Sequence, residues 1–307
     1  MNNFVDLQIN GCWGIDFNLL DLSQQDWDRA CKQLMESGTS HFLPTVITDS
    51  LEGMTKKIDR IAGLCELKSE GSAQPIGIHV EGPFISPIPG YIGAHPMAHA
   101  IPASVDNAKR LVDAGRGWVR MMTLAPEMDL DAEVVDYLAR QNILVAAGHT
   151  NTSADQLQKA IDHGLRCFTH LGNGCPPELP RHDNIIHRVM SVRDQISVTL
   201  IADGFHLPLW MLRMLIEWFG DERTVIVSDA ISAAGLPSGY HTLGDRRVWV
   251  DEDGVPRSED HSHFVGSGAT LDHMLSLVQS IQPWSESTLK KLFRDNAAKL
   301  LDMSAQT

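Results

Sequence analysis

The sequence has few basic residues for its length. Its 307 residues include 25 Lys and Arg against 39 Asp and Glu, which gives a formal net charge of −14 at pH 7. A protein without a basic surface releases few counterions from phosphates, so a nucleic-acid partner is not expected. Apolar runs long enough to cross a bilayer are missing, and the start, MNNFVDLQINGC, lacks the basic and then apolar layout of a secretory leader. We therefore expect a cytoplasmic protein that binds neither nucleic acid nor membrane.

Cysteines are also few and scattered. The five of them are Cys12, Cys31, Cys65, Cys167 and Cys175, and no two form a C-x-x-C pair. An odd number without paired spacing argues against a disulfide framework and against a thiolate zinc site. No G-x-G-x-x-G follows the first apolar run, which weakens a dinucleotide-binding alternative. The thiols are expected to be reduced and mostly buried.

What the sequence does contain is a regular alternation of short apolar runs and longer helix-like segments. Eight runs rich in apolar and β-branched residues begin near Phe4, His41, Pro75, Gly117, Ile143, Arg166, Ile196 and Thr224. The intervening segments carry helix signals, such as Ser23 before residues 24–37 with Gly38 after them, and Thr152 or Ser153 before a helix that ends at Gly164. Apolar strands with helical crossovers indicate a parallel sheet, and eight such units favour a closed (β/α)8 TIM barrel.

The barrel is expected to form a single domain over residues 1–307, because no linker, repeat or low-complexity tract divides the chain. Residues 239–263 are polar and rich in turns, with RRVWV inside them. We interpret them as a hairpin excursion after the eighth strand rather than as a second domain.

Polar residues gather where the predicted strands end. In chain order they are Gln8, Asn10, Glu81, His149, His170, Asp203, His206 and Asp229. The carboxyl ends of barrel strands meet at one face, where active sites lie, so these side chains should converge. Imidazole nitrogens and carboxylate oxygens are ligands for Zn2+ and similar ions, and a catalytic site keeps three protein ligands with one open position. Glu81, His149 and His170 fit that requirement.

Any one of these residues has an ordinary structural explanation, since a lone strand-end His is more often a hydrogen-bonded structural residue and a lone Asp more often a cap. Three ligand-type residues and an Asp at four strand ends are hard to explain by structural need alone. His79 shares the alternation of Glu81 along its strand. We interpret it as a histidine of the barrel interior and leave it out of the metal set.

Several blocks in order along nearly the whole chain carry a family resemblance. They are FVDLQINGCWGIDFN, HVEGPFISPIPGYIGAHP, GHTNTSADQLQKAIDHGLRCFTHLGNG, IADGFH, VSDAISAAGLPSG, GSGATLDHM and DNAAKLL. Together they resemble the N-acetylglucosamine-6-phosphate deacetylase family of the amidohydrolase superfamily. The resemblance implies hydrolysis of the N-acetyl group of an amino sugar, with N-acetylglucosamine 6-phosphate as substrate and a homodimer as the working form.

The resemblance also implies roles for particular residues. Glu81, His149 and His170 occupy the positions of the family's metal ligands, the same three that the strand ends select. Asp229 matches the general acid/base of the family. His95 and His206 match residues that contact the substrate.

The expected cofactor is a single divalent ion. Gln8 and Asn10 stand where many amidohydrolases have an H-x-H pair for a second metal, a replacement typical of single-metal deacetylases. We favour Zn2+, although Fe2+, Co2+ or Mn2+ would also suit two histidines and a carboxylate.

Two departures from the family pattern bear on the expected substrate and fold. The family's small β-sandwich domain is expected to be absent, because the chain starts at the first block and stops shortly after the last. The stretch HLGNGCPPELPRHDN also differs from the usual H-L-[FY]-N-A-M. Asn173 and Gly174 still offer backbone N–H groups there, and Arg181, eleven residues after His170, is suitably placed to act as the family's phosphate-binding Arg, in its own or a neighbouring subunit.

These departures keep other readings of the function open. The alternatives are another amidohydrolase acting on a non-phosphorylated N-acyl sugar or a cyclic amide, and a sugar-binding relative that has lost catalysis. Asp229 argues against the last, because a binding module needs no proton shuttle.

Overall fold

The computed structural model describes residues 3–303 except 68–69, 244–245, 260 and 262–264. Eight parallel strands form the barrel wall: β1 Phe4–Ile9, β4 Thr39–Ile47, β6 Ile78–Glu81, β7 Val119–Leu124, β8 Leu144–Ala147, β9 Leu165–Phe168, β10 Ser197–Ile201 and β11 Thr224–Val227. Each of the eight predicted runs overlaps one of them. The short β5 (Gln74–Pro75) pairs with β4, and Ile9 forms a parallel bridge to Ala230 that joins the two ends of the sheet. The predicted TIM barrel is confirmed.

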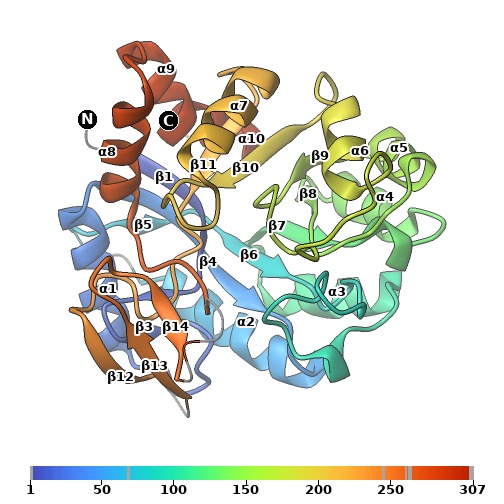
Figure 1. Ribbon diagram of the computed structural model, residues 1–307. Coiled ribbons are helices and arrows are strands. Elements are labelled where there is room, and N and C mark those ends of the chain that lie inside the picture. Colours follow the sequence, from blue (N-terminus) through green and yellow to red (C-terminus); the bar gives the residue numbers. More distant parts are fainter. Residues whose placement is uncertain (1–2, 68–69, 244–245, 260, 262–264, 304–307) are drawn as a thin grey trace.

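Helices cover the outside of this barrel (Figure 1). They are α1 Gln24–Glu36, α2 Leu51–Cys65, α3 Val105–Ala114, α4 Glu133–Arg140, α5 Ala154–Asp162, α6 Ile185–Ser191, α7 Leu209–Phe219, α8 Leu271–Ile281, α9 Glu286–Lys290 and α10 Asn296–Leu300, with short helical turns η1 Met97–His99, η2 Pro126–Met128 and η3 Lys291–Asp295. Local signals start them: the Ser23 side chain accepts from the Asp26 N–H, and Ser153 forms a capping box with Gln156. Of the two caps considered for α5, Ser153 is the one used.

The strands are buried on both faces, as expected for a sheet wrapped by helices. All residues of β8 and β10 are buried, and the core cluster runs from Phe4 to Leu301. Four of the five cysteines are buried, Cys175 is half-buried, and none forms a disulfide. No helix within the described ranges is both long and apolar enough to cross a membrane.

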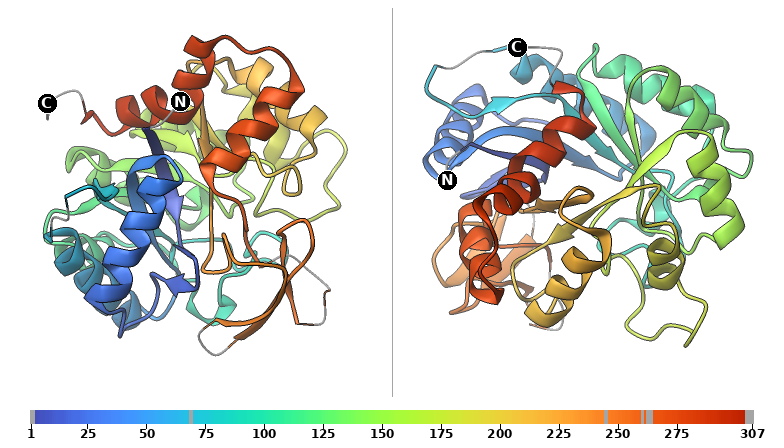
Figure 2. Two further views of the ribbon diagram at one scale, coloured as in Figure 1. Left: turned by 90° about the vertical axis from the view of Figure 1, so that its left-hand side faces the viewer. Right: turned by 90° about the horizontal axis from the view of Figure 1, so that it is seen from above.

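Smaller strands accompany the barrel. A short antiparallel pair, β2 (Gly11–Cys12) with β3 (Ile15–Asp16), follows β1. After β11, three antiparallel strands form a separate small sheet: β12 Gly239–Leu243, β13 Arg246–Val250 and β14 Pro256–Ser258. Where the sequence indicates a two-stranded hairpin at 239–263, the structure has a third strand, while residues 244–245, 260 and 262–263 of that range lie outside the described part. Two views show this sheet at the opposite end of the molecule from α8 and α9 (Figures 1 and 2).

Candidate metal centre and active site

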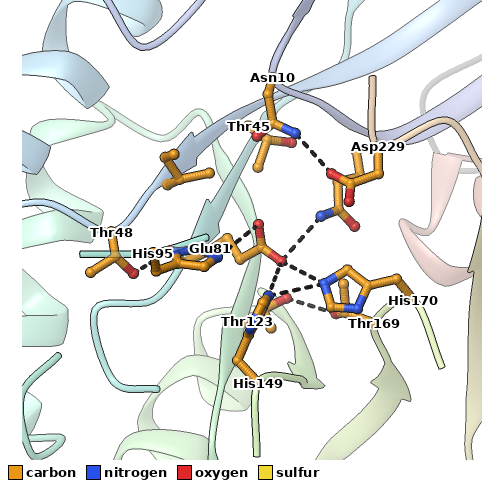
Figure 3. A network of polar contacts seen from close by, with 12 residues as sticks. Asn10, Thr45, Thr48, Glu81, His95, Thr123, His149, Thr169, His170 and Asp229 are labelled. Carbon is orange, nitrogen blue, oxygen red and sulfur yellow. Dashed lines mark hydrogen bonds and ion pairs between the residues drawn. The ribbon is translucent and has the colours of Figure 1, made fainter. Parts of the chain in front are cut away.

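The strand ends place four charged or ligating side chains around the barrel mouth. Glu81 is the last residue of β6, and His149, His170 and Asp229 each lie two residues after the end of β8, β9 and β11. These last three have left-handed backbones, with φ of 50°, 37° and 46°. Such conformations cost non-glycine residues of order 1–3 kcal/mol and cluster at active sites. The same turn recurs on three strands, and the four side chains face a common centre (Figure 3).

Glu81, His149 and His170, the three residues predicted as ligands, meet at one point. The Nε2 atom of His170 lies 3.0 Å from Oε1 of Glu81 and 3.1 Å from Nε2 of His149, and the His149 Nε2 lies 3.4 Å from the same Oε1 (Figure 3). All three residues are buried. Two imidazole nitrogens and a carboxylate oxygen within this distance form a donor set that can hold a divalent metal ion.

His95, expected from the sequence at the substrate, lies directly beside this group. Its Nε2 is 3.8 Å from Oε2 of Glu81, and its ring stands edge-on to that of His149 with centroids 4.4 Å apart. Ligand atoms of Glu81, His95 and His149 all lie within 4.8 Å of one another, so these residues form an overlapping candidate set. His170 makes the shorter contacts. We therefore keep it as the third candidate ligand, with His95 at the edge of the cluster.

The ring of His149 is held in the orientation that ligation needs. Its Nδ1 lies 2.9 Å from the carbonyl oxygen of Tyr91. A carbonyl only accepts, so Nδ1 carries the proton and the lone pair of Nε2 faces Glu81. Gly93 and Gly174 pack against the ring, since a Cβ atom at either position would lie 3.0–3.1 Å from it. Gly174, expected at the substrate, thus also packs against the ring of a candidate ligand.

Buried polar atoms without a partner concentrate at this place. Among the described residues, six buried side-chain nitrogen or oxygen atoms lack a hydrogen-bond partner, and five belong to the site: Gln8 Oε1, Asn10 Oδ1, His95 Nδ1, His170 Nδ1 and Asn173 Nδ2. The sixth, on Gln33, is elsewhere. Buried polar groups are nearly always satisfied, and exceptions call for a specific explanation such as a ligand or an ion. The residues at the barrel mouth therefore fit a bound cation and a polar substrate.

The pKa values of two carboxyl groups in the site are shifted in opposite directions. Burial works to raise the pKa of Glu81, but the contacts of its carboxylate with the His149 and His170 side chains outweigh it and hold that pKa well below 4.5. Burial, together with the negative charge of Glu81, raises the pKa of Asp229 to about 6. Glu81 is thus suited to remain an anion, whereas Asp229 can gain and lose a proton near neutral pH.

The two amides of β1 and the turn after it each donate to one of these carboxylates. Gln8 Nε2 lies 3.1 Å from Oε1 of Glu81, and Asn10 Nδ2 lies 2.8 Å from Oδ1 of Asp229 (Figure 3 for Asn10). Gln8 and Asn10 therefore act here as donors to the two carboxylates.

The remaining predicted residues differ in how firmly they are held. His206 Nδ1 lies 2.7 Å from Oδ2 of Asp203, whose other oxygen accepts the backbone N–H groups of Phe205 and His206. Asn173 follows His170 in the same turn, with its N–H on the His170 carbonyl. Arg181 is exposed and makes no hydrogen bond or ion pair with any residue that the structure describes. No described contact joins Arg181 to Glu81, His149 or His170.

Supporting residues around the loop after His149 were missed by the sequence reasoning. Glu127 binds the Thr150 hydroxyl and the Asn151 N–H, and Arg188 donates to the carbonyls of Asn151 and Thr152. Glu127 comes shortly after the fourth barrel strand, so the strand-end rule could have found it. Nothing in the local pattern distinguishes Arg188 from any other helical arginine.

An eight-stranded parallel barrel with a buried Glu–His–His cluster and a neighbouring Asp at its carboxyl face has the architecture of the metal-dependent amidohydrolases. No protein-family model matches the chain. A curated N-acetylglucosamine-6-phosphate deacetylase from Danio rerio is 33% identical over 297 residues, which is 93% of this chain and 69% of that protein. The enzyme of the same name from Lysinibacillus sphaericus is 27% identical over 98% of this chain and 76% of that protein.

Solved structures agree with this result. The deacetylase from Thermotoga maritima is 30% identical with a TM-score of 0.84, covering 99% of this chain and 79% of that one. A mutant of the deacetylase from Mycobacterium smegmatis, in complex with N-acetyl-D-glucosamine 6-phosphate, gives a TM-score of 0.86 at 26% identity over 98% and 77% of the two chains. The chain belongs to the N-acetylglucosamine-6-phosphate deacetylase family. It spans about three fifths of some curated relatives, such as the human protein at 61%.

Proposed function

We propose that this protein hydrolyses the N-acetyl group of N-acetylglucosamine 6-phosphate, giving the amine and acetate. The observation that carries the proposal is the convergence of Glu81, His149 and His170 next to Asp229, an acid whose pKa is raised to about 6. Family membership supports the choice of an amino sugar. In this proposal Glu81, His149 and His170 hold one divalent ion, for which we favour Zn2+ over Fe2+, Co2+ or Mn2+.

A divalent cation at these residues would supply a Lewis acid that polarises the acetyl carbonyl and lowers the pKa of a water molecule. Asp229 accepts the proton of the attacking water and returns it to the departing amine nitrogen. Asn10 occupies Oδ1 of Asp229, which leaves Oδ2 to exchange that proton. Gln8 keeps the Glu81 carboxylate facing the two histidines.

Substrate contacts are assigned to residues around the centre. The side chain of His95 is buried, and burial lowers its pKa to about 3, so it faces the substrate as a neutral imidazole. His206, oriented by Asp203, would stabilise the developing negative charge on the carbonyl oxygen. Asn173, Gly174 and Arg181 would bind the far end of the sugar. A homodimer in the cytoplasm is part of the same proposal, on the strength of the family alone.

A second candidate substrate is a non-phosphorylated N-acyl sugar. The observation in its favour is Arg181, the expected phosphate ligand, which is exposed and makes no polar contact with any described residue. A phosphorylated sugar would need a positive side chain at its binding site, because the chain as a whole carries a formal charge of −14 and repels anions.

The test is acetate release by the full chain from N-acetylglucosamine 6-phosphate and from N-acetylglucosamine, with metal analysis of the same sample. A kcat/KM that is higher for the phosphorylated sugar, with one metal ion per chain, is the expected result. A preference for the neutral sugar would favour the second candidate. Absence of turnover on a panel of N-acetyl amino sugars and cyclic amides, with metal bound, would leave only a sugar-binding role.

A further inference from the structure

A buried polar layer lies in the barrel interior directly beneath the proposed metal centre. His79, Thr123 and Thr169 are 0% exposed. The Nε2 atom of His79 lies 2.8 Å from the Thr123 hydroxyl, which lies 2.8 Å from the Thr169 hydroxyl. The interior of such barrels is usually filled with Val, Ile and Leu, and burying polar groups is costly unless they bind one another. Three mutually bonded polar side chains at this depth therefore call for a reason.

The three side chains form one chain of hydrogen bonds with Thr123 in its middle. A hydroxyl has a single proton, so Thr123 donates to one of its two neighbours and accepts from the other. The other ring nitrogen of His79, Nδ1, lies 3.5 Å from the Thr45 hydroxyl. Removing the Thr123 hydroxyl therefore breaks the contacts to both His79 and Thr169.

The layer joins parts of the barrel that no backbone ladder joins directly. His79 lies on β6 two residues before Glu81, Thr123 lies on β7, and Thr169 immediately precedes His170. In the sheet, β6 reaches β9 only through β7 and β8. The β6–β7 and β8–β9 ladders both contain register irregularities. The side-chain layer is thus the short connection from the strand of Glu81 to the residue that precedes His170.

We propose that Thr123 is a positioning residue that, through His79 and Thr169, sets the separation of Glu81 and His170 and so the affinity of the site for its divalent cation. The proposal rests on the metal-binding part of the proposed function. Thr123 and Thr169 are drawn in the same network of polar contacts as the candidate ligands (Figure 3). The backbone of His170 is also held by a second contact, because its N–H donates to the Thr199 hydroxyl at 2.7 Å.

The test is Thr123→Val, which keeps the shape of the side chain and removes its hydroxyl. The affinity of the full chain for Zn2+ and for Co2+ is measured by competition with a chromophoric chelator, together with the visible spectrum of the Co2+ form. Residues that support metal ligands typically change affinity by about 10–100-fold, and a loss of this size with an altered Co2+ spectrum is expected. Thr123→Ser, which restores the hydroxyl, should return both readouts towards wild type.

The matched control is Thr224→Val. Thr224 is also fully buried in the barrel wall and its hydroxyl also makes one internal hydrogen bond, to the Gly220 carbonyl at 2.9 Å, but it lies at the amino end of β11. This variant should lower the melting temperature and keep the metal affinity. Thr169→Val is the second variant if Thr123→Val does not fold, since it removes the outer hydroxyl and leaves the Thr123–His79 contact in place.

The outcomes are distinguishable. Wild-type protein that binds no divalent cation would overturn the proposed function, and the positioning role with it. Wild-type protein that binds the ion, with equal affinity in Thr123→Val or in Thr169→Val, would overturn the positioning role alone. Equal losses in Thr123→Val and Thr224→Val would show a general loosening of the barrel and would also overturn it.

Discussion

The candidate metal centre and the loop that carries Arg181 contrast in how firmly the chain holds them. At the centre, Glu81, His149 and His170 are buried. The Oε1 atom of Glu81 and the Nε2 atoms of the two histidines lie within 3.4 Å of one another. Arg181, only eleven residues after His170, is exposed and has no polar partner among the described residues. The barrel fixes the positions of Glu81, His149 and His170, whereas no described contact fixes the side chain of Arg181.

This difference separates the chemistry of the protein from its choice of substrate. Strand ends and buried hydrogen bonds pre-arrange the groups that would hold an ion and move a proton, which is how enzymes reduce reorganisation during the reaction. The group expected to recognise a phosphate has no such support. A contact with the sugar's phosphate, or with a neighbouring subunit, would have to hold the Arg181 side chain in place.

The largest expected effect comes from removing the anionic ligand. Glu81→Gln keeps the size of the side chain but loses the charge that attracts a divalent ion, so we expect no metal after dialysis and acetate release at the background rate. Glu127→Gln is the control, because Glu127 also follows a barrel strand but binds the loop after His149 instead. One equivalent of tightly held metal in Glu81→Gln would show that the centre lies elsewhere.

Removing the proton shuttle should be nearly as severe while leaving the ion in place. Asp229→Asn is expected to lower kcat by about a hundredfold to ten-thousandfold, the usual contribution of general acid–base catalysis. Metal content measured on the same sample should equal that of wild type. Activity within a few fold of wild type would remove Asp229 from its assigned role.

A substitution in the loop should affect only one class of substrate. Hydrogen bonds to charged groups contribute about 1.5–3 kcal/mol, so Arg181→Ala should raise KM about tenfold to a hundredfold for the phosphorylated sugar. Hydrolysis of the neutral sugar should hardly change. Arg140→Ala is the control, since Arg140 is an exposed arginine on α4 that forms an ion pair with Asp136. Identical kinetics for Arg181→Ala and wild type would exclude Arg181 from the site and favour a neutral substrate.

The smallest effect concerns pH. Burial and the charge of Glu81 raise the pKa of Asp229 to about 6, and a base works only in its deprotonated form. We expect kcat/KM to fall below about pH 6, by about tenfold for each pH unit, and a bound cation should move this limb to lower pH. Asn10→Ala removes a donor that favours the charged carboxylate, so its limb should lie at higher pH. An acid limb above pH 7 in wild type would contradict the assignment.

Much of the barrel could be predicted because its signals are local. Apolar runs alternate with helical patterns. Ser23 and Ser153 cap the helices that follow them, because each side chain accepts a hydrogen bond from the backbone N–H three residues later. The expected strand ends also predicted that Glu81, His149 and His170 lie together, because the carboxyl ends of parallel barrel strands lie at one face regardless of the path of the loops. The third strand of the small sheet, β14, was missed, because Pro256–Ser258 is too short and too polar to carry a strand pattern.

The sequence by itself determined the order of strands and helices and which side chains stand at the strand ends, since these follow from spacing and from backbone hydrogen bonds between near neighbours. Only the tertiary structure decided that His95 reaches Glu81 from a loop, that the Tyr91 carbonyl sets the proton of His149, and that Arg181 remains exposed. The physical reason is that the path of a loop depends on packing against residues far away in the chain. No local pattern contains that information.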